Sequence, residues 1–108
     1  MELTKTDKKQ LTDIIHQGIL RRCEEWLKET ADIINKDYGE ENAFDRCMEV
    51  TKRSRDYHKE VIARENYYRN TMLLTGAAEL LSSGYLTADD FKEVRPEVYD
   101  AIRLWARM

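Results

Sequence analysis

The forty residues from Ala43 to Ser82, AFDRCMEVTKRSRDYHKEVIARENYYRNTMLLTGAAELLS, decide the fold of this chain. They contain no Pro and a single Gly, Gly76, so nothing in them forces a helix to stop before Ser83 and Gly84. Apolar residues recur at spacings of three, four and seven, which places them along one side of a helix. We therefore predict one long helix over residues 43–82. The sequence leaves open whether this helix breaks in the polar region around residues 51–56.

The end of this stretch, residues 72–81, reads MLLTGAAELL and is apolar on most sides of a helix. Such a segment needs packing partners on more than one face. We therefore predict that it forms the centre of the hydrophobic core.

The composition favours a single all-α domain over residues 1–108. The chain has 42% hydrophobic and 36% charged residues, a balance typical of amphipathic helices rather than of disorder. Four Gly and one Pro leave little turn chemistry for a β-sheet. A length of 108 residues is close to the commonest domain size.

Charge and cysteine content disfavour several classes of function and location. With 18 basic and 21 acidic residues the net charge is −3, so the whole chain does not attract a polyanion and we expect no general nucleic-acid binding. Two cysteines are far fewer than a small secreted disulfide scaffold uses. The first ten residues, MELTKTDKKQ, do not resemble a signal peptide, and no apolar run has the length of a membrane span. We expect a cytoplasmic protein without membrane association.

A first helix is expected over residues 7–38. Thr6 or Asp7 can cap it, and its apolar residues recur at helical spacing. Gly18 in its interior either marks the close approach of another backbone or is simply tolerated. The apolar residues of this helix are Leu11, Ile14, Ile15, Ile19, Leu20, Cys23, Trp26, Leu27, Ile33 and Ile34.

Residues 38–42, YGEEN, form the expected turn between the two long helices. Gly39 can take the left-handed conformation that ends a helix, and Asn42 can cap the next one. A connection this short makes the two helices antiparallel. Residues that face each other across the turn should then have numbers that sum to about 81.

Two short helices are expected at the carboxyl end, over residues 87–94 and 96–107. Thr87 and Asp90 have the spacing of a capping box, and Pro96 suits the first turn of a helix. These helices would cover the end of the second long helix. The predicted architecture is a long antiparallel helical hairpin capped by two short helices.

Polar residues inside the apolar stripes form the first candidate site. The facing rule places His58 near Cys23 and Glu65 near His16, so histidine, thiol and carboxylate groups would line one seam. Seven positions separate His16 from Cys23, about 10 Å along a helix, so the two layers cannot share one metal ion. The Glu-x-x-His motif of di-metal helical bundles is also absent. We interpret the seam as a hydrogen-bonded polar layer, with no metal and no cofactor.

A reactive thiol is the second candidate, since an imidazolium at His58 could ionise Cys23. No third residue that would orient this pair can be identified, and a cysteine on an apolar seam is more often a small buried hydrophobe. A disulfide between Cys23 and Cys47 is disfavoured because the facing rule puts them about 16 Å apart. We therefore expect two free thiols, no catalytic residues and no enzymatic activity.

A basic run on the second helix is the third candidate. Lys52, Arg55 and Lys59 fall within an arc of about 60°, and Arg53 is their neighbour in the sequence. Such a ridge could bind a small anionic ligand, such as a nucleotide, at an oligomer interface. The alternative is a solvated helix face with ion pairs between residues four apart.

The fourth candidate is a surplus of aromatic and apolar residues, more than one short helical cap can hide. An elongated hairpin has little interior of its own and often buries such residues in a symmetric dimer. We therefore predict a small non-enzymatic helical interaction protein, of the adaptor, inhibitor or regulator type, that contacts another protein and acts as a homo-oligomer. The residues predicted to make these contacts are Tyr67, Leu74, Leu81, Tyr85, Tyr99 and Trp105.

Overall fold

Helices form nearly all of the chain in the computed structural model, which describes residues 1–36 and 39–107 without the side chains of Arg69 and Asn70. No β-strand occurs among these residues, and the predicted all-α class is confirmed. The elements in chain order are α1 (Lys5–Asn35), the 3₁₀ turn η1 (Glu40–Asn42), α2 (Ala43–Tyr57), the π-helical turn η2 (His58–Ile62), α3 (Ala63–Thr71), α4 (Leu73–Ser82), the 3₁₀ turn η3 (Ala88–Phe91) and α5 (Pro96–Ala106).

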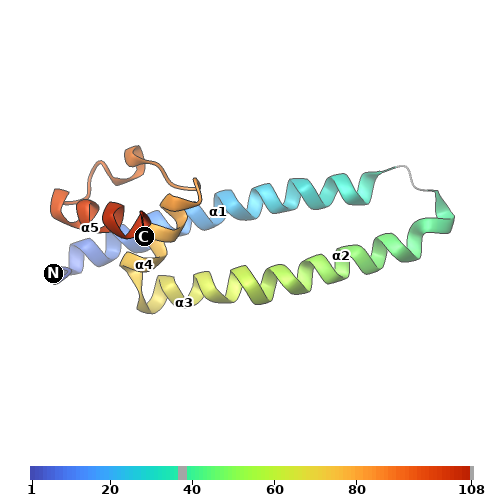
Figure 1. Ribbon diagram of the computed structural model, residues 1–108, viewed down its shortest axis with the longest axis horizontal. Helices are drawn as coiled ribbons and strands as arrows, with labels where there is room; N and C mark the ends of the chain where they lie inside the picture. Colours follow the sequence, from blue (N-terminus) through green and yellow to red (C-terminus); the bar gives the residue numbers. More distant parts are fainter. Residues whose placement is uncertain (37–38, 108) are drawn as a thin grey trace.

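The helices form a compact head from which a two-helix arm projects (Figure 1). The head contains the first half of α1 together with α4, η3 and α5, and we define it as residues 1–19 and 73–107. The arm contains the second half of α1 together with α2, η2 and α3, residues 20–36 and 39–72. The molecule is 58 Å long and 24 Å across in both other directions, because the arm extends well beyond the head.

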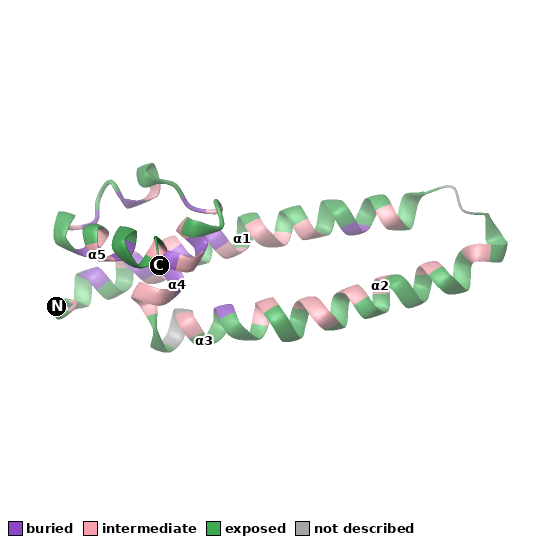
Figure 2. Cartoon of the chain, in the orientation of Figure 1, coloured by how far each residue is buried: buried purple, intermediate pink, exposed green. Residues whose placement is uncertain are grey.

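The hydrophobic core lies entirely in the head, where α1 packs against α4 and α4 packs against α5 (Figure 2). Because burial of apolar surface is the dominant favourable term in folding, the head supplies most of the stability. The buried apolar residues of the described chain are Leu11, Ile15, Ala77, Ala78, Leu80, Leu86, Phe91, Val94, Val98 and Ile102.

The predicted helix over residues 43–82 does not run unbroken. A π-helical turn interrupts it at η2, and at Met72 the backbone leaves the helical region, with φ −135° and ψ 69°. Beyond Met72, α4 turns back onto α1 instead of extending the arm. The reason is that residues 72–81 are apolar on most sides, so the turn buries surface that a straight helix would leave in water. The polar region around residues 51–56 stays helical.

Two glycines allow the helices of the head to approach closely. A Cβ atom on Gly76 would lie 2.9 Å from the Cβ of Tyr68, so glycine is what allows α4 to pack this tightly against the end of α3. A Cβ atom on Gly18 would lie 3.0 Å from the Leu80 side chain and 3.1 Å from that of Leu86. Gly18 therefore marks a close approach, made by side chains of the head rather than by another backbone.

Helix α1 begins at Lys5, two residues before the predicted start, because Thr4 is its cap rather than Thr6 or Asp7. The Asp7 amide donates to Thr4 Oγ1 at 3.0 Å, and the Thr4 amide donates to Asp7 Oδ2 at 2.8 Å. This reciprocal pair is a capping box with Asp in the third helical position. The helix ends at Asn35, where the backbone of Lys36 is extended, and the predicted end at residue 38 lies outside the described residues.

The turn and the carboxyl-terminal segment follow their sequence signals. Gly39 has a positive φ of 76°, which glycine adopts readily, but α1 already ends at Asn35, so Gly39 lies in the turn and does not end the helix as predicted. Thr87 and Asp90 form the predicted capping box, and Pro96 begins α5 as predicted. The segment predicted as a helix over residues 87–94 is shorter than expected and is the 3₁₀ turn η3.

Asp7 joins the start of α1 to the start of α5. Its carboxylate is buried and accepts hydrogen bonds from Arg95, at 3.0 Å from Nε and 2.6 Å from Nη2. The side-chain hydrogen bonds from Arg95, and after them the bond from the Thr4 amide, hold the pKa of Asp7 well below its usual range. The charged form of Asp7 is therefore the one that stabilises the head.

We expect the Asp7→Asn variant to be less sensitive to acid than the wild type. The pKa of Asp7 is lower in the folded chain than in the unfolded chain, so its contribution is complete above the unfolded pKa of about 3.9 and is lost as the pH falls toward the folded pKa. Thermal unfolding followed by circular dichroism should give the variant a lower Tm at pH 7 and a smaller fall in Tm between pH 5 and pH 3. Asp13→Asn, which removes only an exposed ion pair with Lys9, is the control and should follow the wild type. A fall in the Asp7 variant as steep as in the wild type would contradict this role.

Candidate functional site

Polar and aromatic side chains fill the inner seam of the arm, where α1 faces α2. The rings of Trp26 and Tyr57 stack with their centroids 5.0 Å apart. The guanidinium of Arg53 lies 5.7 Å from the centroid of Trp26, and it donates hydrogen bonds to Thr30 Oγ1 at 3.0 Å and to Glu29 at 2.6 Å. Burial raises the pKa of the Tyr57 hydroxyl above its ordinary value, because its charged form would be poorly solvated. These contacts join the two helices largely through polar and ring interactions.

A buried ion pair between Arg22 and Glu65 joins α1 to α3 at the head end of the arm. The Arg22 guanidinium also lies 4.6 Å from the ring centroid of Tyr85, whose hydroxyl donates to Glu25 at 2.8 Å. Burial raises the pKa of Glu65 more than the charge and the hydrogen bond of Arg22 lower it. The pair thus joins the two helices of the arm at the cost of burying a charge, and the contact of Arg22 with Tyr85 links this end of the arm to the head.

The predicted polar layer of histidine, thiol and carboxylate groups is wrong in its partners. Glu65 pairs with Arg22 rather than with His16, and both His16 and His58 are exposed. The facing rule assumed two regular helices, whereas the π-helical turn η2 inserts extra residues into one of them and α1 runs on into the head. Cys23 is half-buried at the seam, while Cys47 is exposed, and both thiols are free.

An outward side of α1 carries a stripe of apolar side chains along the arm. Three pairs of adjacent apolar residues repeat every seven positions: Ile19 and Leu20, Trp26 and Leu27, Ile33 and Ile34. In each pair the first residue is half-buried and the second is exposed, with exposed fractions of 48% for Leu20, 59% for Leu27 and 51% for Ile34. Because seven residues are close to two helical turns, these three side chains lie in line. We name Leu20, Leu27 and Ile34 the arm stripe.

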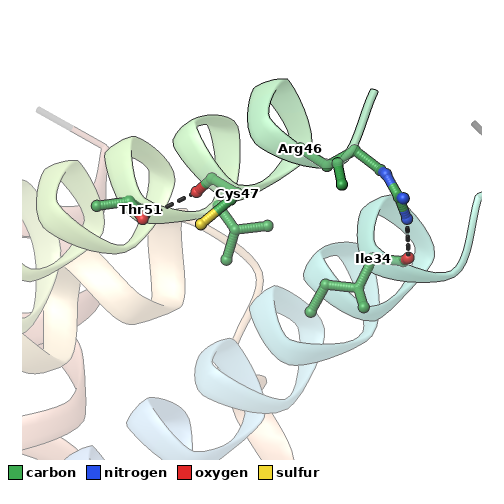
Figure 3. A pocket seen from close by; sticks show the side chains of 6 residues that line it. Ile34, Arg46, Cys47 and Thr51 are labelled. Carbon is green, nitrogen blue, oxygen red and sulfur yellow. Dashed lines mark hydrogen bonds between the residues drawn. The ribbon is translucent and has the colours of Figure 1, made fainter. Parts of the chain in front are cut away.

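The arm stripe meets α2 at the tip of the arm. Ile34 borders a shallow groove of about 340 Å³ whose other wall is the first half of α2 (Figure 3). Within this groove the Thr51 hydroxyl donates to the carbonyl of Cys47 at 2.8 Å, and Arg46 donates to the carbonyl of Ile34 at 3.3 Å. Ile34, the last residue of the arm stripe, therefore belongs to a surface that both helices build. Two further apolar residues at the start of α2 are exposed, Phe44 and Met48.

Ion pairs cover other sides of the arm. Arg53 pairs with Glu29 across the two helices, and Arg21 donates two hydrogen bonds to the carboxylate of Asp90 in the head, at 2.9 and 3.0 Å. The bonds from Arg21 lower the pKa of Asp90 below its ordinary value. The arm is thus polar on these sides and apolar along the arm stripe.

The arm has no closed apolar core of its own. Among its described residues the buried side chains are Thr30 and Glu65, and both are polar. Figure 2 shows the same contrast, because nearly all of the purple, buried segments lie in the head. The indole Nε1 of Trp26 is buried without a hydrogen-bond partner in the described part of the chain. The two helices therefore leave apolar surface that another chain can cover.

The six residues predicted to contact another protein do not form one surface. Tyr67 in the arm and Trp105 in α5 are exposed. The other four are half-buried and pack against the core of the head, so they contribute to folding. Their role in contacts with another protein stays a prediction. These four residues are Leu74, Leu81, Tyr85 and Tyr99.

In the sequence, Leu20, Leu27 and Ile34 belong to the single set of apolar residues at helical spacing in the first helix. The signal that identifies the arm stripe is the repeat of adjacent apolar pairs, since two neighbours on a helix point about 100° apart. One partner helix cannot cover so wide an apolar arc. The second member of each pair is therefore left in water.

Three of the four predicted anion-binding residues share an exposed surface. Lys52, Arg55 and Lys59 are exposed, on the side of the helix that faces away from α1. Arg53 instead points toward α1 and pairs with Glu29, so it does not belong to this ridge. The local pairing of Arg53 supports the solvated-face interpretation for that residue.

Comparison of the chain with protein-family models, curated proteins and solved structures finds no match in any of the three. Across residues 1–36 and 39–107, no group of three His, Cys, Asp or Glu side chains is placed to hold a metal ion. No helix in that part of the chain is long and apolar enough to cross a membrane.

Proposed function

We propose that this protein is a small non-enzymatic interaction protein whose arm binds another protein chain, and that it acts as a homo-oligomer. The observation that carries the proposal is the arm stripe: three aliphatic side chains, each about half exposed, in line on an arm without a closed apolar core. An apolar line on a projecting helix is a common anchor for helix-to-helix recognition. The head folds around its own core and holds the arm for binding.

The free energy gained by burying the arm stripe indicates whether the interface has to extend beyond these three residues. Full burial of an exposed Leu or Ile side chain contributes about 1.5–3 kcal/mol, so the three half-exposed residues of the arm stripe contribute about 3 kcal/mol together. Association costs about 4–15 kcal/mol in lost freedom of motion. The arm stripe alone does not offset this cost. The interface must therefore include the groove at the tip and the exposed start of α2.

Anion binding, the alternative function, has less support. It requires several cations that converge on one ligand, whereas Arg53 is held by Glu29 and Thr30. Lys52, Arg55 and Lys59 remain, on one exposed helix side where salt screens their charges. We therefore favour protein binding.

Changing Leu27 to Glu is expected to dissociate the oligomer, because it places an unpaired carboxylate at the centre of the arm stripe. Light scattering of the wild type should give at least twice the 12.8 kDa mass of one chain. The variant should give the mass of one chain, with self-affinity weakened at least about 100-fold.

Leu104→Glu is the matched control for this experiment. Leu104 is an exposed leucine like Leu27, but it lies on α5 in the head, so the same substitution should leave the oligomer intact. A wild-type mass of one chain at every concentration would contradict self-association. Equal loss of the oligomer in both variants would contradict the assignment of the interface to the arm.

A further inference from the structure

We infer that the arm stripe packs against the arm stripe of a second copy, with the two α1 helices antiparallel and crossing at Leu27. The two heads then lie at opposite ends of the dimer. This inference rests on the proposed function and adds the arrangement of the two copies to it.

The arm stripe is complementary to itself when it is reversed. Leu20 and Ile34 lie seven residues before and after Leu27, about 10 Å on either side along the helix. A two-fold axis through Leu27 places Leu27 against its own copy, and Leu20 against Ile34 of the second copy. Every contact between the two arm stripes is then apolar against apolar.

The charged side chains beside the arm stripe are also complementary when the two α1 helices run antiparallel. Glu24 and Lys28 lie on the same edge of the stripe, next to Leu27, and their side chains are 3.4 Å apart within one chain. Rotation about Leu27 brings Glu24 of one copy within about 3 Å, along the helix axis, of Lys28 of the other. Opposite charges thus meet at the rim of the interface, where they favour one orientation more than they add affinity.

The alternative arrangement, with both heads at one end, matches the surfaces less well. It places α1 of one copy against α2 of the other. The stacked rings of Trp26 and Tyr57 show which part of α2 lies level with Leu27. On the side facing the second copy, the end of α2 and the start of η2 present Ser54 and His58, which are exposed and polar. Leu27 would then be buried against polar groups that lose water without gaining partners.

The overlap of two arms gives an interface of moderate size. Residues 20–36 of α1 span about 25 Å, and two helices side by side are about 20 Å wide. The buried area is therefore about 500 Å² per copy and about 1,000 Å² in total, close to the lower limit for a specific interface. We accordingly expect a dimer that dissociates on dilution rather than a permanent one.

Distances between spin labels test this arrangement on the full chain. Cys23→Ser and Cys47→Ser remove the native thiols, and a single cysteine at Lys92 (head) or Glu41 (tip of the arm) then carries the label; both positions are exposed. Light scattering first establishes that each labelled chain keeps the mass of the wild type. Pulsed dipolar spectroscopy is then run on each labelled chain alone and on an equal mixture of the two.

The expected distance between two head labels is about 50 Å or more. Gln10 donates to the carbonyl of Glu93, next to the label, and lies 17 positions before Leu27, so each label is about 25 Å from the two-fold axis along the helix. In the mixture, a head label and a tip label should lie within about 30 Å, since the tip of one copy lies beside the head of the other and the whole molecule is 24 Å across.

Two results would overturn the inference in different ways. A dimer with head labels closer than about 30 Å would show both heads at one end; the proposed function would stand and the antiparallel arrangement would fall. If light scattering gives both the wild type and the labelled chains the mass of a monomer, the protein does not self-associate and both proposals fail. When Leu27→Glu is added to the labelled chains, the antiparallel dimer should dissociate and the dipolar signal between the copies should disappear.

Discussion

Replacing Ile102 with Ala is expected to lower the free energy of unfolding by about 2–5 kcal/mol. Ile102 is 0% exposed and lies on the face of α5 that packs in the core of the head. The substitution removes buried methyl and methylene groups and leaves a cavity that the neighbouring helices only partly fill. A domain of this size has about 5–15 kcal/mol in total, so the variant should be only marginally folded. Urea unfolding followed by far-ultraviolet circular dichroism measures the difference.

Leu104→Ala tests whether the cost belongs to the core position and not to α5 in general. Leu104 is two residues further along the same helix and is 62% exposed, so its truncation should change the free energy of unfolding by less than about 0.5 kcal/mol. Similar losses at Ile102 and Leu104 would mean that α5 does not pack on α4 through the face described above.

Replacing Arg22 with Ala is expected to cost about 3–5 kcal/mol, because it leaves the carboxylate of Glu65 buried without its partner. The pKa of Glu65 is already raised by burial, so the folded chain holds this proton at pH values where the unfolded chain has lost it. Stability from this group therefore falls as the pH rises from the unfolded pKa of about 4.3 through the higher folded pKa. The variant should be furthest from the wild type at neutral pH and closest to it near pH 4, in urea unfolding at each pH.

Glu65→Gln in the Arg22→Ala background separates the buried charge from the lost packing of the arginine side chain. Removal of the charge should recover part of the stability, with a coupling energy of about 0.5–3 kcal/mol in the double-mutant cycle. Additive losses in the cycle would show that the two side chains do not form the ion pair described. Tyr85, which the Arg22 guanidinium contacts, stays unchanged in all four proteins.

The interaction surface could be predicted only in part. The prediction of an apolar surplus and of a self-interface came from the number of apolar residues, which the sequence states directly. Which of these apolar residues are buried and which are exposed depends on how many helices pack around each of them. Leu74 and Leu81 looked like surplus because they point away from a straight hairpin, but α4 folds back and packs them against the core of the head. Leu20 and Leu27 looked packed because they belong to the same helical period as Trp26, yet no second partner in the described part of the chain covers them.

The sequence by itself determined the local features of this protein. Helical periodicity and the scarcity of Gly and Pro determine the all-α class, and the turn at Gly39, the capping box of Thr87 and Asp90 and the start of α5 at Pro96 depend on residues within a few positions of each other. Such signals act between residues within one or two helical turns of each other, so the sequence contains them in full.

The tertiary structure alone decided the features that depend on contacts between distant residues. The turn at Met72 occurs because α4 gains more burial against α1 and α5 than it would in a straight helix. Arg22 replaces His16 as the partner of Glu65 because η2 and the path of α1 into the head change which residues meet. The exposure of Leu27 beside Trp26 depends on how many helices pack around α1, since periodicity defines an apolar side but not the number of its partners.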